Sequence, residues 1–309
     1  MFQLYKKRDF SSYITDTVMF FKHYWKNYFS NFIVITGALL LVLCVIFYFI
    51  FRDVFGALIN GSSGNFDFST YFQDNWVSFA IMVFIAVLVT ILFSLACMSY
   101  PVAYLQLVEK TGRNSFTSSE LLDQIKGQLG RVFMFGLLSF LILFPLLMVV
   151  TVISVLAIFL VIGIFLIFML TPVFTVWVTQ ALFVYLNEKT GFFEALARSW
   201  NILFNKKFWH IVGSTFVVYM AISIIQSIFS LIPYFIMIFS VLGTGTEPDF
   251  ASTRIVFAMT ALYILALVAS YILSNFLMIT QGLIYYSSLE QKEHTQAFYE
   301  IDMIGRNAE

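Results

Sequence analysis

The sequence predicts an all-α polytopic membrane protein with six transmembrane helices, and two observations carry that prediction. First, 61% of the 309 residues are hydrophobic and only 11% are charged, whereas a typical soluble domain has about 25% charged residues. Second, long uncharged runs alternate with short charged segments, as expected for helices that span a bilayer. The formal net charge is zero, which gives no general attraction to nucleic acid.

The uncharged runs predict where the spans lie, because about 20 apolar residues cross the hydrocarbon core as a helix. The run from 132 to 187 has no charged residue and is too long for one span. We therefore expect two spans there, joined by a short turn between Ser154 and Gly163. The other expected spans are Phe32–Phe51, Trp76–Leu107, Phe208–Val241 and Ile255–Tyr286. Consecutive spans then form three hairpins.

The distribution of Lys and Arg predicts the orientation, because cytoplasmic loops of membrane proteins are enriched in these residues. Of the 17 Lys and Arg residues, 15 lie before the first span, in segments 108–131 and 188–207, or in the tail 287–309. Only Arg52 and Arg254 lie on the other side of the predicted spans. We therefore expect both termini in the cytoplasm.

Each predicted hairpin is preceded by a cytoplasmic segment in which apolar residues recur at the spacing of an amphipathic helix. In the second segment, Thr117 and Glu120 fit a capping box at the helix start. In the third, Glu194 and Arg198 are spaced to form an i,i+4 ion pair. We expect all three helices to lie in the headgroup plane at the cytoplasmic face.

The first and third cytoplasmic segments also align as sequence. HYWKNYFSNFIVITG resembles RSWNILFNKKFWHIVG, which has one extra residue. The aligned pairs are Trp25 with Trp200, Phe29 with Phe204, and Gly37 with Gly213. We interpret residues 1–309 as a single membrane domain of three repeats, 10–107, 117–187 and 191–286, followed by a cytoplasmic tail, 287–309. The alternative is that amphipathic connectors occur in any membrane protein.

The sequence contains no recognisable catalytic, cofactor-binding or metal-binding motif, and we expect none of these sites. No Asp, Glu, Lys or Arg lies in the middle of a predicted span, which argues against a proton or ion path. The polar side chains that do occur in the spans include Gln180, Gln226, Asn275 and Gln281. They form hydrogen bonds between helices, or they line a cavity for a lipid or solute.

Basic and aromatic residues adjoin where the fifth span begins. Topology alone accounts for the basic residues. The other interpretation is that they bind anionic headgroups, with tryptophan at the interface. The residues of this predicted lipid-headgroup interface are Arg198, Trp200, Lys206, Lys207 and Trp209.

The segment 188–215, EKTGFFEALARSWNILFNKKFWHIVGST, resembles the recurring segment of the membrane domain fused to some bacterial glycerophosphoryl diester phosphodiesterases, and that of YciC-type uncharacterised inner-membrane proteins. The matching residues are Ala195, Arg198, Ser199, Trp200, Phe208 and Trp209. The resemblance implies a membrane module of the bacterial cytoplasmic (inner) membrane. It does not imply phosphodiesterase activity, because no segment here is long enough for a (β/α)₈ barrel of about 250 residues.

Together these patterns predict a non-enzymatic inner-membrane protein that organises membrane lipids or protein partners at the cytoplasmic face. The alternative is a transporter or flippase for a lipid-like or hydrophobic solute, working through the four amide side chains. A third hypothesis is a membrane enzyme at the cytoplasmic rim, using groups such as Glu194, Arg198 and His210. No cofactor and no nucleic-acid partner is expected.

Overall fold

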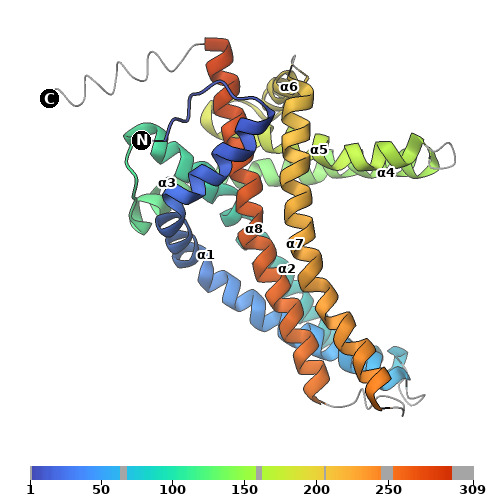
Figure 1. The fold of residues 1–309 in the computed structure, drawn as a ribbon. Helices are drawn as coiled ribbons and strands as arrows, with labels where there is room; N and C mark the ends of the chain where they lie inside the picture. The colour runs from blue at the N-terminus through green and yellow to red at the C-terminus, as the bar shows by residue number, and fades with distance from the viewer. Residues whose placement is uncertain (1, 63–67, 158–161, 205–206, 245–252, 294–309) are drawn as a thin grey trace. The chain divides into compact units, whose positions relative to one another are not determined.

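A computed structural model describes residues 2–62, 68–157, 162–204, 207–244 and 253–293, and within these ranges the chain is all-helical, without a strand (Figure 1). The helices are α1 (Phe10–Ser62), α2 (Phe68–Thr111), α3 (Ser118–Leu138), α4 (Phe144–Leu156), α5 (Ile162–Asn187), α6 (Phe192–Leu203), α7 (Phe208–Thr244) and α8 (Thr253–Glu293). A π-helical segment, Ser139–Leu143, joins α3 to α4.

Within the described residues, six helical segments are long and apolar enough to cross a membrane, which agrees with the predicted number of spans. They are Phe10–Arg52, Trp76–Thr111, Ser118–Leu156, Phe168–Asn187, Phe208–Phe229 and Phe257–Gln291. The uncharged run from 132 to 187 divides as predicted, since α4 ends at Leu156 and α5 begins at Ile162. These two helices contact each other.

The helices expected before each hairpin are not all separate elements. The first is the beginning of α1, which continues into the span without a break, and the second is α3, which continues into α4. Only α6 is separated from the span that follows it. The extra residue of the third segment falls between Phe204 and Gly213. In an unbroken helix, one inserted residue turns every later side chain by about 100° around the helix axis. The residues aligned with the first segment before the insertion and those aligned with it after the insertion would then no longer keep their positions relative to one another.

The capping box predicted for the second segment is confirmed. The Thr117 hydroxyl accepts from the backbone N–H of Glu120, and the Glu120 carboxylate accepts from the backbone N–H of Thr117. Asp9 caps α1 similarly, since its carboxylate accepts from both the N–H and the hydroxyl of Ser12. These hydrogen bonds lower the pKa of Asp9.

Contacts divide the chain into two compact units. The first unit comprises Met1–Ile33, Leu95–Met220 and Asn275–Glu309, and the second comprises Val34–Ser94 and Ala221–Ser274. The boundaries fall inside α1, α2, α7 and α8 rather than in linkers. The units therefore do not follow the three predicted repeats, and each is described separately below.

The core of the first unit lies where α2, α5 and α8 pack together. Every residue is buried over 99–106, 180–186 and 279–287, which is the pattern of a helix surrounded on all sides. Gly282 permits the close approach, because an added Cβ would overlap with Cδ1 of Leu105 and lie 3.1 Å from Cζ of Phe183.

A buried aromatic cluster joins the first half of α1 to this core. The rings of Phe20, Tyr28 and Tyr104 meet edge to face, with centroids 4.8–6.1 Å apart. Asn27, the residue before Tyr28, pairs with both backbone groups of Phe116: its amide donates to the carbonyl at 3.0 Å, and its oxygen accepts from the N–H at 3.1 Å. The loop before α3 is thereby bound to α1.

The second unit buries few of its described side chains. Leu43, Phe93 and Thr260 are buried, whereas many apolar side chains are exposed, as Leu41 is at 69% and Trp76 at 62%. Phe93 packs edge to face on Tyr271, with ring centroids 4.5 Å apart. An exposed apolar surface on helices with few charged residues is the surface that lipid would cover.

Candidate functional site

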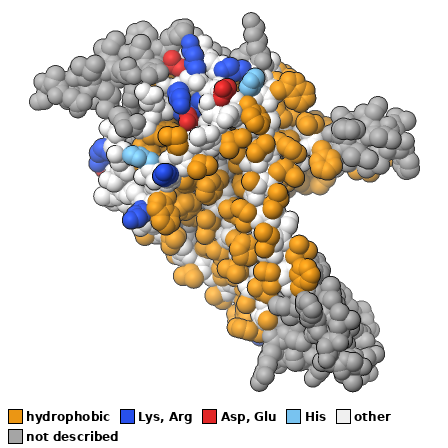
Figure 2. All heavy atoms as spheres, viewed as in Figure 1, with side chains coloured by type: hydrophobic (Ala, Val, Ile, Leu, Met, Phe, Trp, Pro, Cys, Tyr) orange, Lys and Arg blue, Asp and Glu red, His pale blue; other side chains and the backbone are white. Residues whose placement is uncertain are grey.

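The charged residues are concentrated in the first unit, which contains 15 of the 17 Lys and Arg residues. Figure 2 shows the described Lys, Arg, Asp, Glu and His side chains gathered at one part of that surface. This is where α2, α5 and α8 end and where α3 and α6 begin. The candidate functional site is built from the residues at these helix ends.

The tetrapeptide Glu-Lys-Thr-Gly occurs twice, at 109–112 and 188–191, at the ends of α2 and α5. Sequence analysis missed it, although the identity of the two segments is a signal that could have been read. The backbones nevertheless differ. α2 continues to Thr111 and Gly112 takes a left-handed φ of 63°, whereas α5 ends at Asn187 and Lys189 takes the left-handed φ of 54°. Left-handed residues are the usual means of ending a helix.

The repeated glutamates accept hydrogen bonds from two adjacent tyrosines of α8. The hydroxyl of Tyr286 donates to Glu109 Oε2 at 2.8 Å, and that of Tyr285 donates to Glu188 Oε1 at 3.3 Å. Tyr5, in the segment before α1, also donates to Glu109. The end of α8 is thus bound to the ends of both α2 and α5, and tyrosine hydroxyls satisfy part of the hydrogen-bonding capacity of the two carboxylates.

Arg8 is the most completely buried charged side chain of this region, with 0% of its side chain exposed. Its Nε donates to Asp16 Oδ2 at 2.8 Å. Its Nη1 and Nη2 donate to the carbonyls of Leu4 and Gln3 at 2.7 and 2.6 Å. Burial lowers the pKa of Arg8, and Asp16 offsets part of that effect. The guanidinium thereby fixes the N-terminal segment on the first unit.

Two of the residues predicted to bind lipid headgroups, Arg198 and Lys207, have polar partners within the protein. Arg198 forms the expected i,i+4 ion pair with Glu194, at 2.8 Å, and a second ion pair with Glu188. The charge of Glu188 and the hydrogen bond to Glu194 raise the pKa of Arg198. Lys207 Nζ donates to the backbone carbonyl of Arg8 at 2.9 Å. Lys206 lies outside the described residues.

The two predicted tryptophans belong to an exposed aromatic row that runs from α5 over α6 to the start of α7. Successive ring centroids are 4.2–5.4 Å apart. Trp200, Phe204 and Trp209 are 47%, 49% and 68% exposed. The members of the exposed aromatic row, in contact order, are Trp177, Trp200, Phe204, Phe208 and Trp209. The opposite face of α6 is buried.

The four amide side chains of the predicted spans form hydrogen bonds, and three of the four belong to the first unit. Gln180 donates to the backbone carbonyl of Gln281 at 2.8 Å and to its side-chain oxygen at 3.1 Å, and Gln281 donates to Thr215 at 2.9 Å. Asn275 accepts from the Tyr28 hydroxyl at 2.8 Å. These residues are buried in the first unit.

The fourth amide, Gln226, belongs to the second unit and donates to Ser270 of the same unit at 2.9 Å. The amides therefore make hydrogen bonds between helices, the first of the two interpretations given above.

Of the rim residues named for an enzyme, Glu194 and Arg198 form an ion pair, and His210 is exposed on α7. Within the described ranges, no group of three or more His, Cys, Asp or Glu side chains is placed to hold a metal ion. No protein-family model, curated protein or solved structure matches this chain.

Proposed function

We propose that this chain is a non-enzymatic integral protein of a bacterial cytoplasmic membrane, which organises lipids and protein partners at the cytoplasmic face. Six apolar helical segments support the membrane location. An even number of spans puts both termini on one side. The concentration of Lys and Arg in the first unit supports a cytoplasmic position for that charged end.

The proposed architecture is three hairpins, each led in by an amphipathic interfacial helix. Two features support a repeated unit. Buried residues recur at matching positions of the three lead-in helices: 17, 21, 24 and 28 in α1, 121, 125, 128 and 132 in α3, and 192, 196, 199 and 203 in α6. The repeated Glu-Lys-Thr-Gly at the ends of α2 and α5 is a second feature. We also propose kinship with the membrane domains named above, from the residues quoted there.

The exposed aromatic row is the observation that carries the functional proposal. Tryptophan is enriched where a membrane protein meets headgroups, because its ring has an apolar body and a polar N–H. Trp200 and Trp209 are both largely exposed, and Lys207 lies between the two helices that bear them. A row of rings beside cationic groups suits the boundary between acyl chains and anionic headgroups.

The lipid proposal predicts that Trp200→Ala with Trp209→Ala lowers the phospholipid that co-purifies with the detergent-solubilised protein by about half, because two exposed interfacial rings are lost. Phosphorus analysis after gel filtration measures the effect. Phe193→Ala is the matched control, since Phe193 is 69% exposed on α6 but is outside the row. An unchanged lipid content in the double variant, or an equal loss in the control, would contradict the proposal.

The orientation predicts a specific labelling pattern for single cysteines introduced after Cys44→Ala and Cys97→Ala. Cysteines at Ser63 and Thr246 should react with an impermeant maleimide applied to intact spheroplasts. A cysteine at Ser119, whose side chain is exposed on α3, should react only after permeabilisation. The reverse pattern would place the termini outside the cytoplasm.

A further inference from the structure

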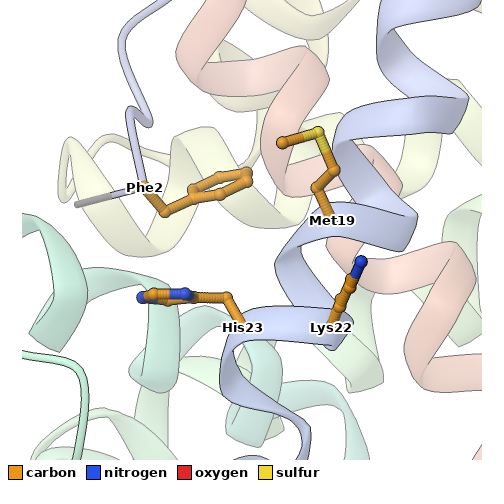
Figure 3. A pocket seen from close by; sticks show the side chains of 4 residues that line it. All are labelled: Phe2, Met19, Lys22 and His23. Carbon is orange, nitrogen blue, oxygen red and sulfur yellow. The ribbon is translucent and has the colours of Figure 1, made fainter.

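An open cavity of about 390 Å³ lies between the N-terminal segment and α1 (Figure 3). Its lining residues are Phe2, Met19, Lys22 and His23. Met19, Lys22 and His23 are spaced i, i+3 and i+4 and so share one face of α1, and Phe2 reaches toward them from the N-terminal segment. All four belong to the first unit.

We propose that this cavity binds the anionic headgroup of a membrane phospholipid. Its two sides have different chemistry: Lys22 and His23 supply N–H donors, whereas Phe2 and Met19 supply an apolar wall. The described residues that line the cavity include no carboxylate, and their chemistry is complementary to a phosphate group joined to a short carbon chain. The proposal rests on the cytoplasmic placement of the first unit proposed above.

The donors are available for a ligand. Within the described residues, Lys22 makes no hydrogen bond or ion pair, and neither do the ring nitrogens of His23, whose ring contacts Tyr24 edge to face. Other cations of this region are already used: Lys6 pairs with Asp16 at 3.2 Å, and Lys207 donates to a carbonyl. A neutral histidine still has one ring N–H to donate, and a protonated one has two.

The apolar wall is held in place by packing. The Phe2 ring lies edge-on to Phe20 and Tyr24, with centroids 5.5 and 6.3 Å apart. Arg8 fixes the rest of the segment through the carbonyls of Gln3 and Leu4. Met19 is 53% exposed beside the two donors. An amphiphile would cover this exposed thioether with its glycerol carbons while its phosphate meets Lys22 and His23.

The volume suits a headgroup rather than a whole lipid, since it lies near the low end of the range of about 300–1,000 Å³ for small-ligand sites. The acyl chains would remain in the bilayer. Because Lys22 and His23 line the cavity, it selects lipids by headgroup charge. This site is distinct from the exposed aromatic row.

The test measures binding of short-chain phosphatidylglycerol to the full-length protein in detergent by native mass spectrometry. Lys22→Ala with His23→Ala should weaken binding by about tenfold, because both N–H donors of the cavity are lost. Lys26→Ala is the matched control: Lys26 is exposed on the same helix, one turn from Lys22, but does not line the cavity. Its binding should stay close to that of the wild type.

Three results would overturn the inference. The first is an equal loss in Lys26→Ala, which would mean diffuse attraction to basic charge. The second is equal binding of phosphatidylcholine, and the third is displacement of the lipid by inorganic phosphate at matched concentration. Trp200→Ala with Trp209→Ala separates the two proposals: if it lowers co-purified lipid while the cavity variant binds phosphatidylglycerol normally, this inference alone fails.

Discussion

Arg8→Ala is expected to lower the free energy of unfolding by about 3–5 kcal/mol, the usual cost of removing one partner of a buried ion pair. Four of the five guanidinium N–H groups are engaged, by Asp16 and by the carbonyls of Gln3, Leu4 and Lys6. The substitution leaves the carboxylate of Asp16, 8% exposed, with a weaker partner. It also leaves the buried carbonyl of Leu4 without this donor.

Lys6→Ala is the matched control for that prediction. Lys6 approaches the same carboxylate at 3.2 Å, but its side chain is 44% exposed. Solvent screens such a pair, so we expect a loss below about 1 kcal/mol. Unfolding in mixed detergent micelles measures both variants, and hydrogen exchange at residues 4–9 should rise only in Arg8→Ala. Equal losses would show that neutralising Asp16, rather than binding the N-terminal segment, is what Arg8 contributes.

The sequence predicted the helices well because membrane spans are specified locally. A run of about 20 apolar residues has few alternatives to a helix in a bilayer, and the six segments follow from that rule. Short-range side-chain pairs were predictable for the same reason. The Thr117–Glu120 capping box and the Glu194–Arg198 ion pair depend only on helical spacing.

Residues whose role depends on distant partners could not be predicted in this way. Lys6, Lys7 and Arg8 form one basic triplet in the sequence, and only the fold distinguishes the buried Arg8 from its neighbours. Burial of a guanidinium needs an internal carboxylate and free carbonyls arranged around it. Asp16 and the carbonyls of residues 3, 4 and 6 supply them, and neither carries a recognisable motif.

The backbone conformation of the two Glu-Lys-Thr-Gly segments could not be predicted from sequence either, because it depends on distant partners. After α5, Arg131 donates to the carbonyls of Tyr185 and Thr190 at 2.7 and 2.8 Å. These bonds engage acceptors at the end of the helix, and α6 begins at once with Phe192. After α2 the helix continues to Thr111. Identical tetrapeptides therefore end their helices at different residues because their tertiary partners differ.

The four amides illustrate a prediction that left two interpretations open. Composition places Gln180, Asn275 and Gln281 in apolar segments but does not say whether they meet a neighbouring helix or a cavity. In the structure each finds a partner on another helix. An unpaired amide in an apolar interior costs free energy, so pairing between helices is the arrangement that burial favours.

Gly282→Val is expected to destabilise the first unit by about 1–3 kcal/mol or more, because overpacking a core forces side chains and helices apart. Even the first added carbon would overlap with Leu105 and crowd Phe183, where α8 packs against α2 and α5. Displacing α8 should also weaken the hydrogen bonds of Tyr285 and Tyr286 to Glu188 and Glu109.

Gly130→Ala in α3 is the control, since no atom lies within 4 Å of its added Cβ. This substitution should stabilise the protein slightly, by about 0.5–1 kcal/mol, through helix propensity. Thermal unfolding in detergent measures both. If Gly282→Val unfolds like the wild type, the three helices do not pack as closely at Gly282 as the structure describes.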